Sequence, residues 1–461
     1  MRYLKHIVLL LLVCIQGYGQ ALTYSEFIDQ VKKYHPISKQ AKIVVDKAGA
    51  DLLSARANFD PTIGFNSDMK TFDGKNYFNY QNTELKIPTW AGIDISTGIE
   101  NNKGQFINSE VSKGQSSYLG ISVPVIKNLV IDKRRAAVLQ AKNLMLASEQ
   151  EKESIVNNLL LDASVQYWKW AAQYQLLKLY KQYVVTSSNR FAITKIAFNN
   201  GERASLDTLE ALTQLQQIKI LENDAELLYT NAGIELSYYL WDKNDSALAV
   251  SPNMVPDTLD SKEISIENSI GDLISLSILK NPEVKTYEYK INNLIIEKKL
   301  KFQSLLPMLN VKSNILNQNY SVFKDAGSQF YQNNYKFGLD FKMPLFAREG
   351  RGDYKKAKLK VAETNLAFTA KKIEVQNKVR TYSNENLYLK KQLETLFVIN
   401  NNTNTLLRGE LIKFYNGDSN LFVVNARENK VIETAEKLVS LQFKILKSYY
   451  ALKWASGIIN Q

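Results

Sequence analysis

Proline placement constrains the fold of this chain more than any other feature of its sequence. The nine prolines leave two long blocks empty, residues 125–251 and residues 345–461, which are 127 and 117 residues long. Because proline in a helix interior costs about 3 kcal/mol, these two blocks are free to form very long helices. One helix over residues 136–199 would reach roughly 95 Å at about 1.5 Å per residue, a distance that a compact domain rarely needs.

The helical blocks also have a regular hydrophobic spacing. Apolar residues recur in alternating steps of four and three, which is the seven-residue spacing of a coiled-coil seam. An ordinary helical-bundle core gives the same spacing, and the length of the blocks favours the coiled coil. The seam residues are Val156, Leu160, Ala163, Tyr167, Trp170, Tyr174 and Leu177, followed by Ala211, Gln214, Ile218, Leu221, Ala225, Leu228 and Ala232.

The proline-bearing regions have a period of two instead. Along residues 335–343, Phe337 and Phe341 share one face, and Lys336 and Asp340 share the other. This alternation is typical of β-strands. A half-buried soluble sheet would look identical, but the aromatic content favours strands of a membrane barrel. Shorter stretches alternate in the same way at residues 62–66, 119–125 and 309–315.

The two halves of the chain share one layout. Pro36 and Pro61 are 25 residues apart, and so are Pro282 and Pro307. Several matching pairs that occur in the same order indicate an internal duplication. The further pairs are Phe27-Ile28 with Leu273-Ile274, Phe198-Asn199-Asn200-Gly201 with Phe414-Tyr415-Asn416-Gly417, and Ser237-Tyr238-Tyr239 with Ser448-Tyr449-Tyr450.

The duplication predicts the domain boundaries. The first repeat, residues 20–241, contains a helix, strands at about 61–124 and a helical block with a hairpin tip near 201. The second repeat, residues 271–461, contains a helix, strands at about 307–344 and a helical block with a hairpin tip near 417. The polar, proline-bearing residues 242–270 are the linker.

The N-terminus has the pattern of a secretory signal peptide over residues 1–19. Arg2 and Lys5 supply positive charge, the run Ile7–Ile15 is apolar, and small residues precede the expected cleavage site. Lipidation of Cys14 is the alternative. After removal of the signal peptide, the chain would be exported and free of cysteine.

Composition excludes several kinds of chemistry. Cys14 is the one cysteine, and His6 and His35 are the two histidines. A disulfide scaffold, a Cys/His zinc site and a histidine-based catalytic triad therefore lack the residues that they need. No later run approaches the ~18–20 apolar residues of a spanning helix, which leaves a soluble chain or a β-barrel. The net charge is +12, and Lys298, Lys299 and Lys301 are expected to lie on a solvated or lumen-facing helix rather than to bind nucleic acid.

These features together resemble the TolC-like outer-membrane efflux channels of Gram-negative bacteria. The resemblance covers nearly the whole chain after the signal peptide. It is carried by the repeat starts Tyr34-His35-Pro36 and Lys280-Asn281-Pro282, the strand-to-helix passage Phe337 to Phe346 with its weaker first copy Ile121 to Val125, and the hairpin tips Phe198 to Gly201 and Tyr415 to Asp418.

The resemblance implies an α+β fold, in which a long α-helical coiled-coil barrel joins a transmembrane β-barrel in a homotrimer of an internally duplicated chain. It implies a place in the lipid of the cell outer membrane with a periplasmic extension. A periplasmic adaptor protein and an inner-membrane pump would be its partners. No catalytic residue, cofactor, metal or nucleic acid is expected. Physical reasoning agrees with an assembly of several chains, because open strand edges are not tolerated in lipid and the chains must pool their strands.

One departure from the family pattern concerns the number of strands. Pro61 to Pro124 spans 63 residues, whereas Pro307 to Pro344 spans 37. The additional residues either add a pair of strands or enlarge an external loop. The family's count of four strands per chain is therefore open for the first half.

The hairpin tips are the expected docking site for the adaptor. Glycine tolerates the positive φ that ends a helix, so each Asn-Gly break predicts a tip. The expected contact residues are Gly201, Ser205, Leu206, Asp207, Gly417, Asp418 and Leu421. Two interpretations are open for Asp207, Glu210 and Asp418: they line a narrow aperture and control ion passage, or they are solvated carboxylates.

The favoured function is a passive exit conduit for efflux or type I secretion. A coiled-coil structural or adhesive envelope protein is the alternative, although it would not need two copies of a strand-plus-hairpin unit. A secreted carboxylate enzyme would be expected to have a compact core. His35, directly before a proline, is expected to be a cap or turn element rather than a catalytic base.

Overall fold

The computed structural model describes residues 21–251, 254–259, 269–320 and 333–460. The expected signal peptide with Cys14 lies outside these residues. The chain divides into two compact units, and each unit takes residues from both halves of the sequence. Unit 1 lies within residues 1–43, 151–284 and 371–461, and unit 2 comprises residues 44–150 and 285–370.

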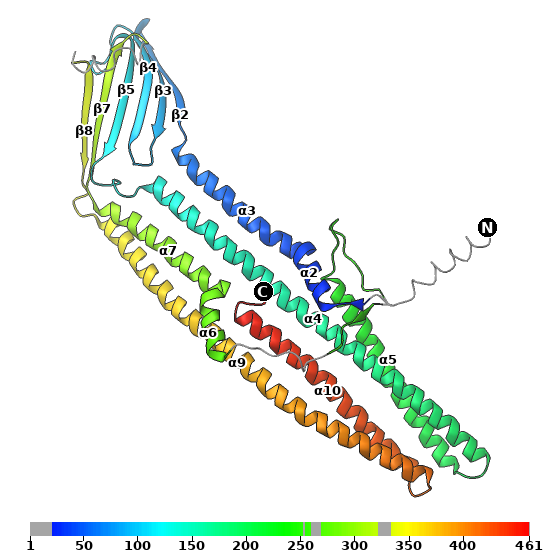
Figure 1. The fold of residues 1–461 in the computed structure, drawn as a ribbon. Coiled ribbons are helices and arrows are strands. Elements are labelled where there is room, and N and C mark those ends of the chain that lie inside the picture. The colour runs from blue at the N-terminus through cyan, green and yellow to red at the C-terminus, as the bar shows by residue number, and fades with distance from the viewer. Residues whose placement is uncertain (1–20, 252–253, 260–268, 321–332, 461) are drawn as a thin grey trace, which may run out of the picture. The chain divides into compact units, whose positions relative to one another are not determined.

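The duplication is visible in the order of the elements (Figure 1). Helices α2 (Tyr24–Tyr34) and α6 (Ile270–Lys280) have 11 residues each, and α3 (Pro36–Arg56) and α7 (Pro282–Phe302) have 21 residues each. Both longer helices begin at proline, which is well tolerated there because the first helical N–H has no partner within the helix. Strands, a very long helix and a shorter returning helix then follow in both halves.

The starts of α2 and α6 are capped alike. Each has a capping box, formed by Thr23 with Glu26 in one case and by Ser269 with Asp272 in the other. At the end of α2, Nδ1 of His35 accepts a hydrogen bond from the backbone N–H of Ile37 at 3.2 Å. Burial lowers the pKa of His35. The prediction that His35 is a turn element is confirmed.

The proline-free blocks form the expected long helices. Helix α4 (Lys133–Asn199) has 67 residues and α9 (Arg348–Tyr415) has 68. Helix α5 (Ser205–Ser237) follows α4, and α10 (Leu421–Ala455) follows α9. None of the helices in the described part of the chain is both long enough and apolar enough to cross a membrane.

The core of unit 1 is aromatic. Phe27 of α2 stacks on Tyr167 of α4, with ring centroids 5.3 Å apart, and Trp170 packs on Tyr167 at 5.9 Å. Leu160 and Tyr450 belong to the same buried cluster. Because Leu160, Tyr167 and Trp170 belong to the predicted seam, the seam in α4 has the right phase.

The seam in α5 is only partly buried within one chain. Its members at seven-residue intervals, from Ala211 and Ile218 to Ala232, are buried. By contrast, Leu221 is 36% exposed and Leu228 is 51% exposed. Because a helix has about 3.6 residues per turn, residues in a strict seven-residue repeat do not stay on one face of it. The two sets of seam residues therefore need not face the same neighbouring helix.

Part of the predicted linker is ordered against unit 1. Strand β1 (Ala21–Leu22) pairs in parallel with β6 (Val255–Pro256). Just after β6, the carboxylate of Asp257 accepts a hydrogen bond from the backbone N–H of Tyr24 at 2.7 Å. The backbone N–H of Asp257 donates to the hydroxyl of Tyr167 at 3.0 Å. These described residues of the linker therefore help to close the aromatic core.

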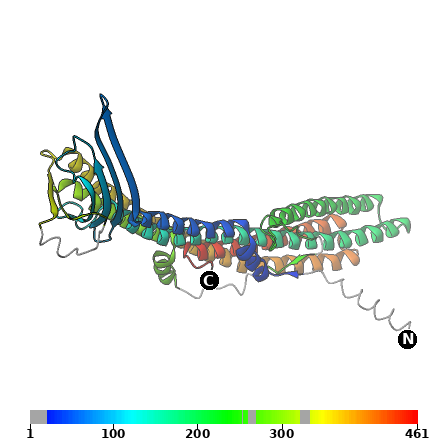
Figure 2. The same cartoon turned by 90° about the horizontal axis from the view of Figure 1, so that it is seen from above.

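Unit 2 contains one antiparallel sheet of six strands in the order β2-β3-β4-β5-β7-β8. Figure 2 shows that the sheet is curved. Four strands come from the first repeat and two from the second, so the additional residues of the first repeat add a strand pair, β3 and β4. The strands are β2 (Thr62–Phe72), β3 (Lys75–Pro88), β4 (Asp94–Lys103), β5 (Gly114–Pro124), β7 (Met308–Gln318) and β8 (Tyr335–Lys342).

The pairing register gives the sheet two distinct faces. Ser96 lies opposite Gly120, which lies opposite Asn314, so polar and small residues continue from strand to strand. Ile95 lies opposite Ile121, and this pair points to the other face of the sheet. The polar face includes Asn66, Asp68, Glu84, Lys86, Glu100, Lys312, Lys336 and Asp340, and the other face includes Ile63, Phe65, Leu85, Ile87, Ile99, Leu119, Val311, Phe337, Leu339 and Phe341.

Candidate functional site

The two helical hairpins of unit 1 end in the same backbone motif. Gly201 follows α4 with φ +78°, and Gly417 follows α9 with φ +84°. In the first tip, the N–H of Gly201 donates to the carbonyl of Phe198, and the N–H of Glu202 donates to that of Ala197, both at 2.9 Å. The second tip repeats both bonds, from Gly417 and Asp418. This pair of bonds is a Schellman motif, which glycine favours because it has no Cβ to clash at positive φ.

The tips lie together, as both views of unit 1 show (Figures 1 and 2). The guanidinium of Arg203, in the α4–α5 turn, lies over the ring of Phe414 with its carbon 4.4 Å from the ring centroid. Its Nη2 also donates to the carbonyl of Phe414 at 3.2 Å. A cation over an aromatic face is attracted by the quadrupole of the ring. Arg203 therefore holds the first tip against the second.

The structure divides the seven predicted contact residues into two groups. Six are exposed or half-buried in the described chain: Gly201, Ser205, Leu206, Asp207, Gly417 and Asp418. Leu206 is 74% exposed. Leu421 is 1% exposed and packs with Ala211, Phe414 and Val424 between the hairpins. Leu421 therefore supports the tips from within and is not at their surface.

The three predicted aperture acids have different surroundings. Asp418 is exposed and Asp207 is half-buried at the start of α5. Glu210 instead accepts a hydrogen bond from the side-chain amide of Asn425 at 3.0 Å, which joins α5 to α10. The structure therefore assigns Glu210 a contact between the hairpins.

A buried ion pair lies behind the tips. Arg190 of α4 donates from Nη1 and Nη2 to the two carboxylate oxygens of Glu428 in α10, at 2.8 and 2.6 Å. The two side chains are 8% and 1% exposed. Such a bidentate geometry is among the strongest that a protein can form, and it fixes the orientation of both partners.

Neutral side chains complete this network. Gln214 of α5 donates to Glu428 at 3.3 Å and to Asn429 at 2.8 Å. Nη1 of Arg190 also donates to the amide oxygen of Asn425 at 3.3 Å. The network therefore connects α4, α5 and α10, and its charges are compensated, as buried charges must be.

Sequence reasoning missed Arg190 and Glu428 as a pair because they lie 238 residues apart. One signal was present, since Gln214 interrupts the apolar seam of α5 at a position that is buried. A polar residue in a seam commonly specifies register, and its partners must then be polar as well. No group of three potential metal ligands occurs among the residues that the structure describes.

Part of the chain resembles a known protein family in sequence. A family model described as outer membrane efflux protein matches residues 28–240. No curated protein sequence matches the chain significantly.

Solved outer-membrane channels share the architecture over 94% of this chain. One is the CmeC outer membrane channel of Campylobacter jejuni, at 15% identity and TM-score 0.65 over 85% of that chain. Others are VceC of Vibrio cholerae, at 12% identity and TM-score 0.65 over 95% of that chain, and the open state of MtrE of Neisseria gonorrhoeae, at 13% identity and TM-score 0.65 over 88%. Residues 28–240 therefore match the model of the outer membrane efflux protein family, and the chain has the fold of these outer-membrane channels.

Proposed function

We propose that this chain is the outer-membrane exit channel of a tripartite efflux or type I secretion system, and that it works as a homotrimer. Three copies would join their sheets into one transmembrane β-barrel and their helices into a periplasmic tunnel. The channel would be a passive conduit, with work supplied by an inner-membrane pump through a periplasmic adaptor. The two unpaired edges of the sheet are the observation that supports this assembly most directly.

Strands β2 and β8 form those edges. All 11 residues of β2 are exposed, and so are seven of the eight residues of β8. Such edges are templates for pairing with another chain, and soluble proteins shorten, charge or cover them. Here Phe65 and Met69 on β2 and Phe337 and Phe341 on β8 give each edge strand one exposed apolar face. Neither strand pairs on its outer side with another strand of the described chain. A neighbouring copy is the partner that satisfies both edges.

The direction of the strands allows this closure. The six strands are antiparallel in sequence order, so β2 and β8 run in opposite directions. The β8 edge of one copy can therefore pair antiparallel with the β2 edge of the next, and three copies close a ring without an open edge. Strands of 8 to 14 residues suit the ~9–11 residues that span a bilayer with tilt. The apolar face would meet lipid, and the polar face would line the lumen.

Disulfide cross-linking across the two edges tests the assembly. Residues 20–461 contain no cysteine. We would place Asn66→Cys on β2 and Gly338→Cys on β8, both on the polar face, and then oxidise outer membranes. The proposal predicts covalent dimers and trimers with nothing larger, and a scan through Asp68→Cys or Lys336→Cys would find the register.

Each single-cysteine variant is the control and should give no such ladder. Ile99→Cys on the inner strand β4 should not join two copies either. Monomers at every register tested, or a ladder that continues beyond three, would contradict the proposal.

The hairpin tips are the proposed docking site for the adaptor. Their exposed residues Gly201, Ser205, Leu206, Gly417 and Asp418, with the half-buried Asp207, support this assignment. Leu206 contributes an exposed apolar side chain and Asp418 an exposed charge, which is the mixture typical of a protein interface. Pull-down of the adaptor by wild type but not by Leu206→Asp would support the site, provided that the variant remains trimeric. Undiminished binding would reject it.

A further inference from the structure

The strand pair β3–β4 has a structural consequence for the width of the channel. The pair comprises Lys75–Pro88 and Asp94–Lys103. It lies between β2 and β5, which are each next to a helix in the sequence. Strand β2 follows α3, β5 precedes α4, β7 follows α7 and β8 precedes α9. The additional pair has no helix of its own, and it widens the sheet at one position, between β2 and β5.

The four helices of unit 2 form a layer in the same order as their strands. Leu52 of α3 packs with Val138 of α4. Asn143 of α4 donates to the carbonyl of Tyr289 in α7 at 2.6 Å. Helices α7 and α9 meet through the rings of Phe302 and Tyr354, whose centroids are 5.6 Å apart, and through the ion pair of Lys301 with Asp353 at 2.6 Å. The helix order is therefore α3-α4-α7-α9.

The widths of the two layers can be compared. Packed helices lie about 8–10 Å apart, so four helices occupy roughly 32–40 Å of a tunnel wall. Strands about 4.8 Å apart and tilted by about 40° each occupy about 6.3 Å of a barrel's circumference. Six strands then occupy about 38 Å, whereas four would occupy about 25 Å. At this tilt, six strands occupy about the width of four helices.

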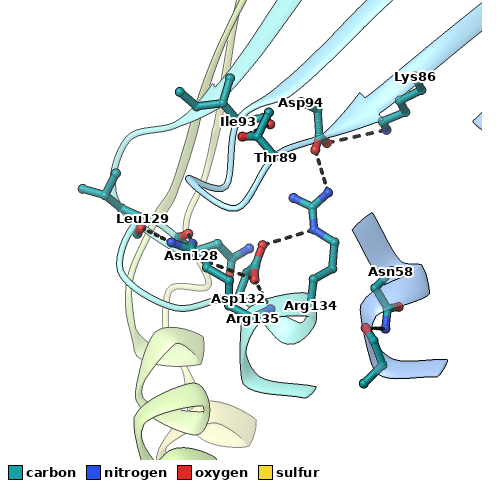
Figure 3. A network of polar contacts seen from close by, with 11 residues as sticks. Asn58, Lys86, Thr89, Ile93, Asp94, Asn128, Leu129, Asp132, Arg134 and Arg135 are labelled. Atoms are coloured by element: carbon teal, nitrogen blue, oxygen red, sulfur yellow. Dashed lines mark hydrogen bonds and ion pairs between the residues drawn. The ribbon is translucent and has the colours of Figure 1, made fainter. Parts of the chain in front are cut away.

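The turn between β3 and β4 is fixed to the helices of unit 2 (Figure 3). Arg134, in the first turn of α4, donates from Nη1 to Asp94 at 2.6 Å and from Nε to Asp132 at 3.3 Å. Lys86 forms an ion pair with Asp94 at 3.6 Å. These bonds join the start of β4, directly after the turn, to the start of α4.

An aromatic contact holds the turn on the side of α3. Trp90 packs on Phe59, at the end of the 3-10 turn that follows α3, with ring centroids 5.3 Å apart. Gly92 of the turn has φ +82°, and a Cβ there would lie 2.8 Å from Nη2 of Arg135. The hairpin is therefore built into the junction between sheet and helices and is not a loose insertion.

The apolar and polar faces of β3 and β4 are those expected of strands in the wall of the barrel. Ile95 lies opposite Ile121, and Ile87 lies opposite Ile95, so the apolar face continues through β3 and β4. On the other face, Tyr118 lies directly over Gly98, and Glu84 and Glu100 continue the polar row. A plug inside the lumen would have no need of an apolar face in register with that of β5.

We propose that β3 and β4 are part of the barrel wall, so that a trimer with six strands per chain forms a barrel of eighteen strands. This inference rests on the proposed function. Barrel diameter grows roughly linearly with strand number, so the bore is about 1.5 times as wide as that of a twelve-stranded barrel, with about twice the cross-section. The membrane part of the channel then passes cargo as wide as its helical layer admits.

Cysteine accessibility tests whether the hairpin is in the wall. In trimers reconstituted into phospholipid vesicles, Ile95→Cys should react with a lipid-soluble pyrene maleimide, and brominated phospholipids should quench that label. Ser96→Cys should react with a charged, water-soluble maleimide and escape quenching. The matched controls on the neighbouring strand are Ile121→Cys and Ser122→Cys. Equal reaction of Ile95→Cys and Ser96→Cys with the water-soluble reagent would overturn the proposal.

A deletion of residues 75–113 tests the width itself. It joins Gly74 to Gly114 and keeps the turn residues Asp73 and Gly74, which both have positive φ, as the hairpin turn requires. Phe72 would then pair with Gly114 in place of Lys75, so every side chain of β2 and β5 keeps its face.

The readout is the largest polyethylene glycol maleimide that labels Ser122→Cys from the barrel mouth. The proposal predicts that the limiting polymer radius falls by about one third in the deletion variant. Ser205→Cys at the tip should be labelled equally in both proteins. An unchanged limit in a trimeric deletion variant would overturn the proposal, and if that variant fails to assemble, the quenching experiment decides. Failure of the proposed function would instead appear as the absence of trimers in the unmodified protein.

Discussion

Replacing Arg190 by methionine tests the buried network behind the tips. The substitution leaves the carboxylate of Glu428, 1% exposed, with one hydrogen bond from Gln214 at 3.3 Å in place of three. Removing one partner of a buried ion pair typically costs about 3–5 kcal/mol, because the remaining charge is uncompensated. We expect this cost to fall on the contact between the two hairpins, since Arg190 and Glu428 lie on different ones.

Hydrogen–deuterium exchange measures this cost locally. A loss of about 3–5 kcal/mol corresponds to exchange that is faster by about two to four powers of ten, at one power of ten per 1.36 kcal/mol. The affected amides should lie in α5 and α10 near Gln214 and Glu428. Amides near Trp170 in the aromatic core of unit 1 should keep their protection.

The double variant Arg190→Met with Glu428→Leu is the control. Replacing a buried ion pair by apolar residues of similar volume is often neutral or stabilising, so protection should return toward that of wild type. Unchanged exchange in the single variant would refute the reasoning. A double variant as damaged as the single one would show that shape, rather than charge, decides the contact.

Three further perturbations follow from the structure. Trp170 is fully buried, so Trp170→Ala should cost about 3–5 kcal/mol, measured as a lower thermal midpoint of the trimer; an unchanged midpoint would contradict the packing. Gly201→Val should cost about 1–2 kcal/mol because of the positive φ, and it should impair drug efflux at a normal trimer level. Gly409→Val, in a helix with open space, should do neither. Loss of trimer in Gly201→Val alone would show that the tip is merely structural. Burial raises the pKa of Asp132, but hydrogen bonds and charge from Arg135 outweigh this and hold the pKa below its usual value. The resulting stability is present above about pH 4 and is lost as the pH falls. Asp132→Asn should remove that acid dependence, as urea titrations at about pH 7 and pH 3 would reveal.

Local patterns in the sequence were sufficient to predict the long helices and the duplication. The absence of proline from 125–251 and 345–461 anticipated α4 and α9, and the paired Asn-Gly breaks anticipated both Schellman motifs. Helices and Schellman motifs depend on neighbours within about five residues along the chain, and the duplication appears as a second copy of the same local patterns. For that reason these features can be predicted without the tertiary structure.

Features that depend on distant residues were not predicted. The bonds of Arg190 to Glu428 and of Arg134 to Asp94 join residues 238 and 40 positions apart, and no periodicity reveals such pairs. The burial of Leu421 depends in the same way on Ala211 and Phe414 of other helices. The sequence between Pro61 and Pro124 allowed either an additional strand pair or an enlarged loop. The pairing of β3 with β2 and β4 shows that it forms the strand pair.

Native mass spectrometry of the protein extracted from outer membranes tests the central claim most directly. The edges at β2 and β8 require other chains to pair with, and the proposed trimer predicts a complex of three chains. Its mass should persist in detergents that preserve membrane proteins and should fall to that of one chain on boiling. A stable monomer in the outer membrane, or a soluble monomer in the periplasm, would contradict the account.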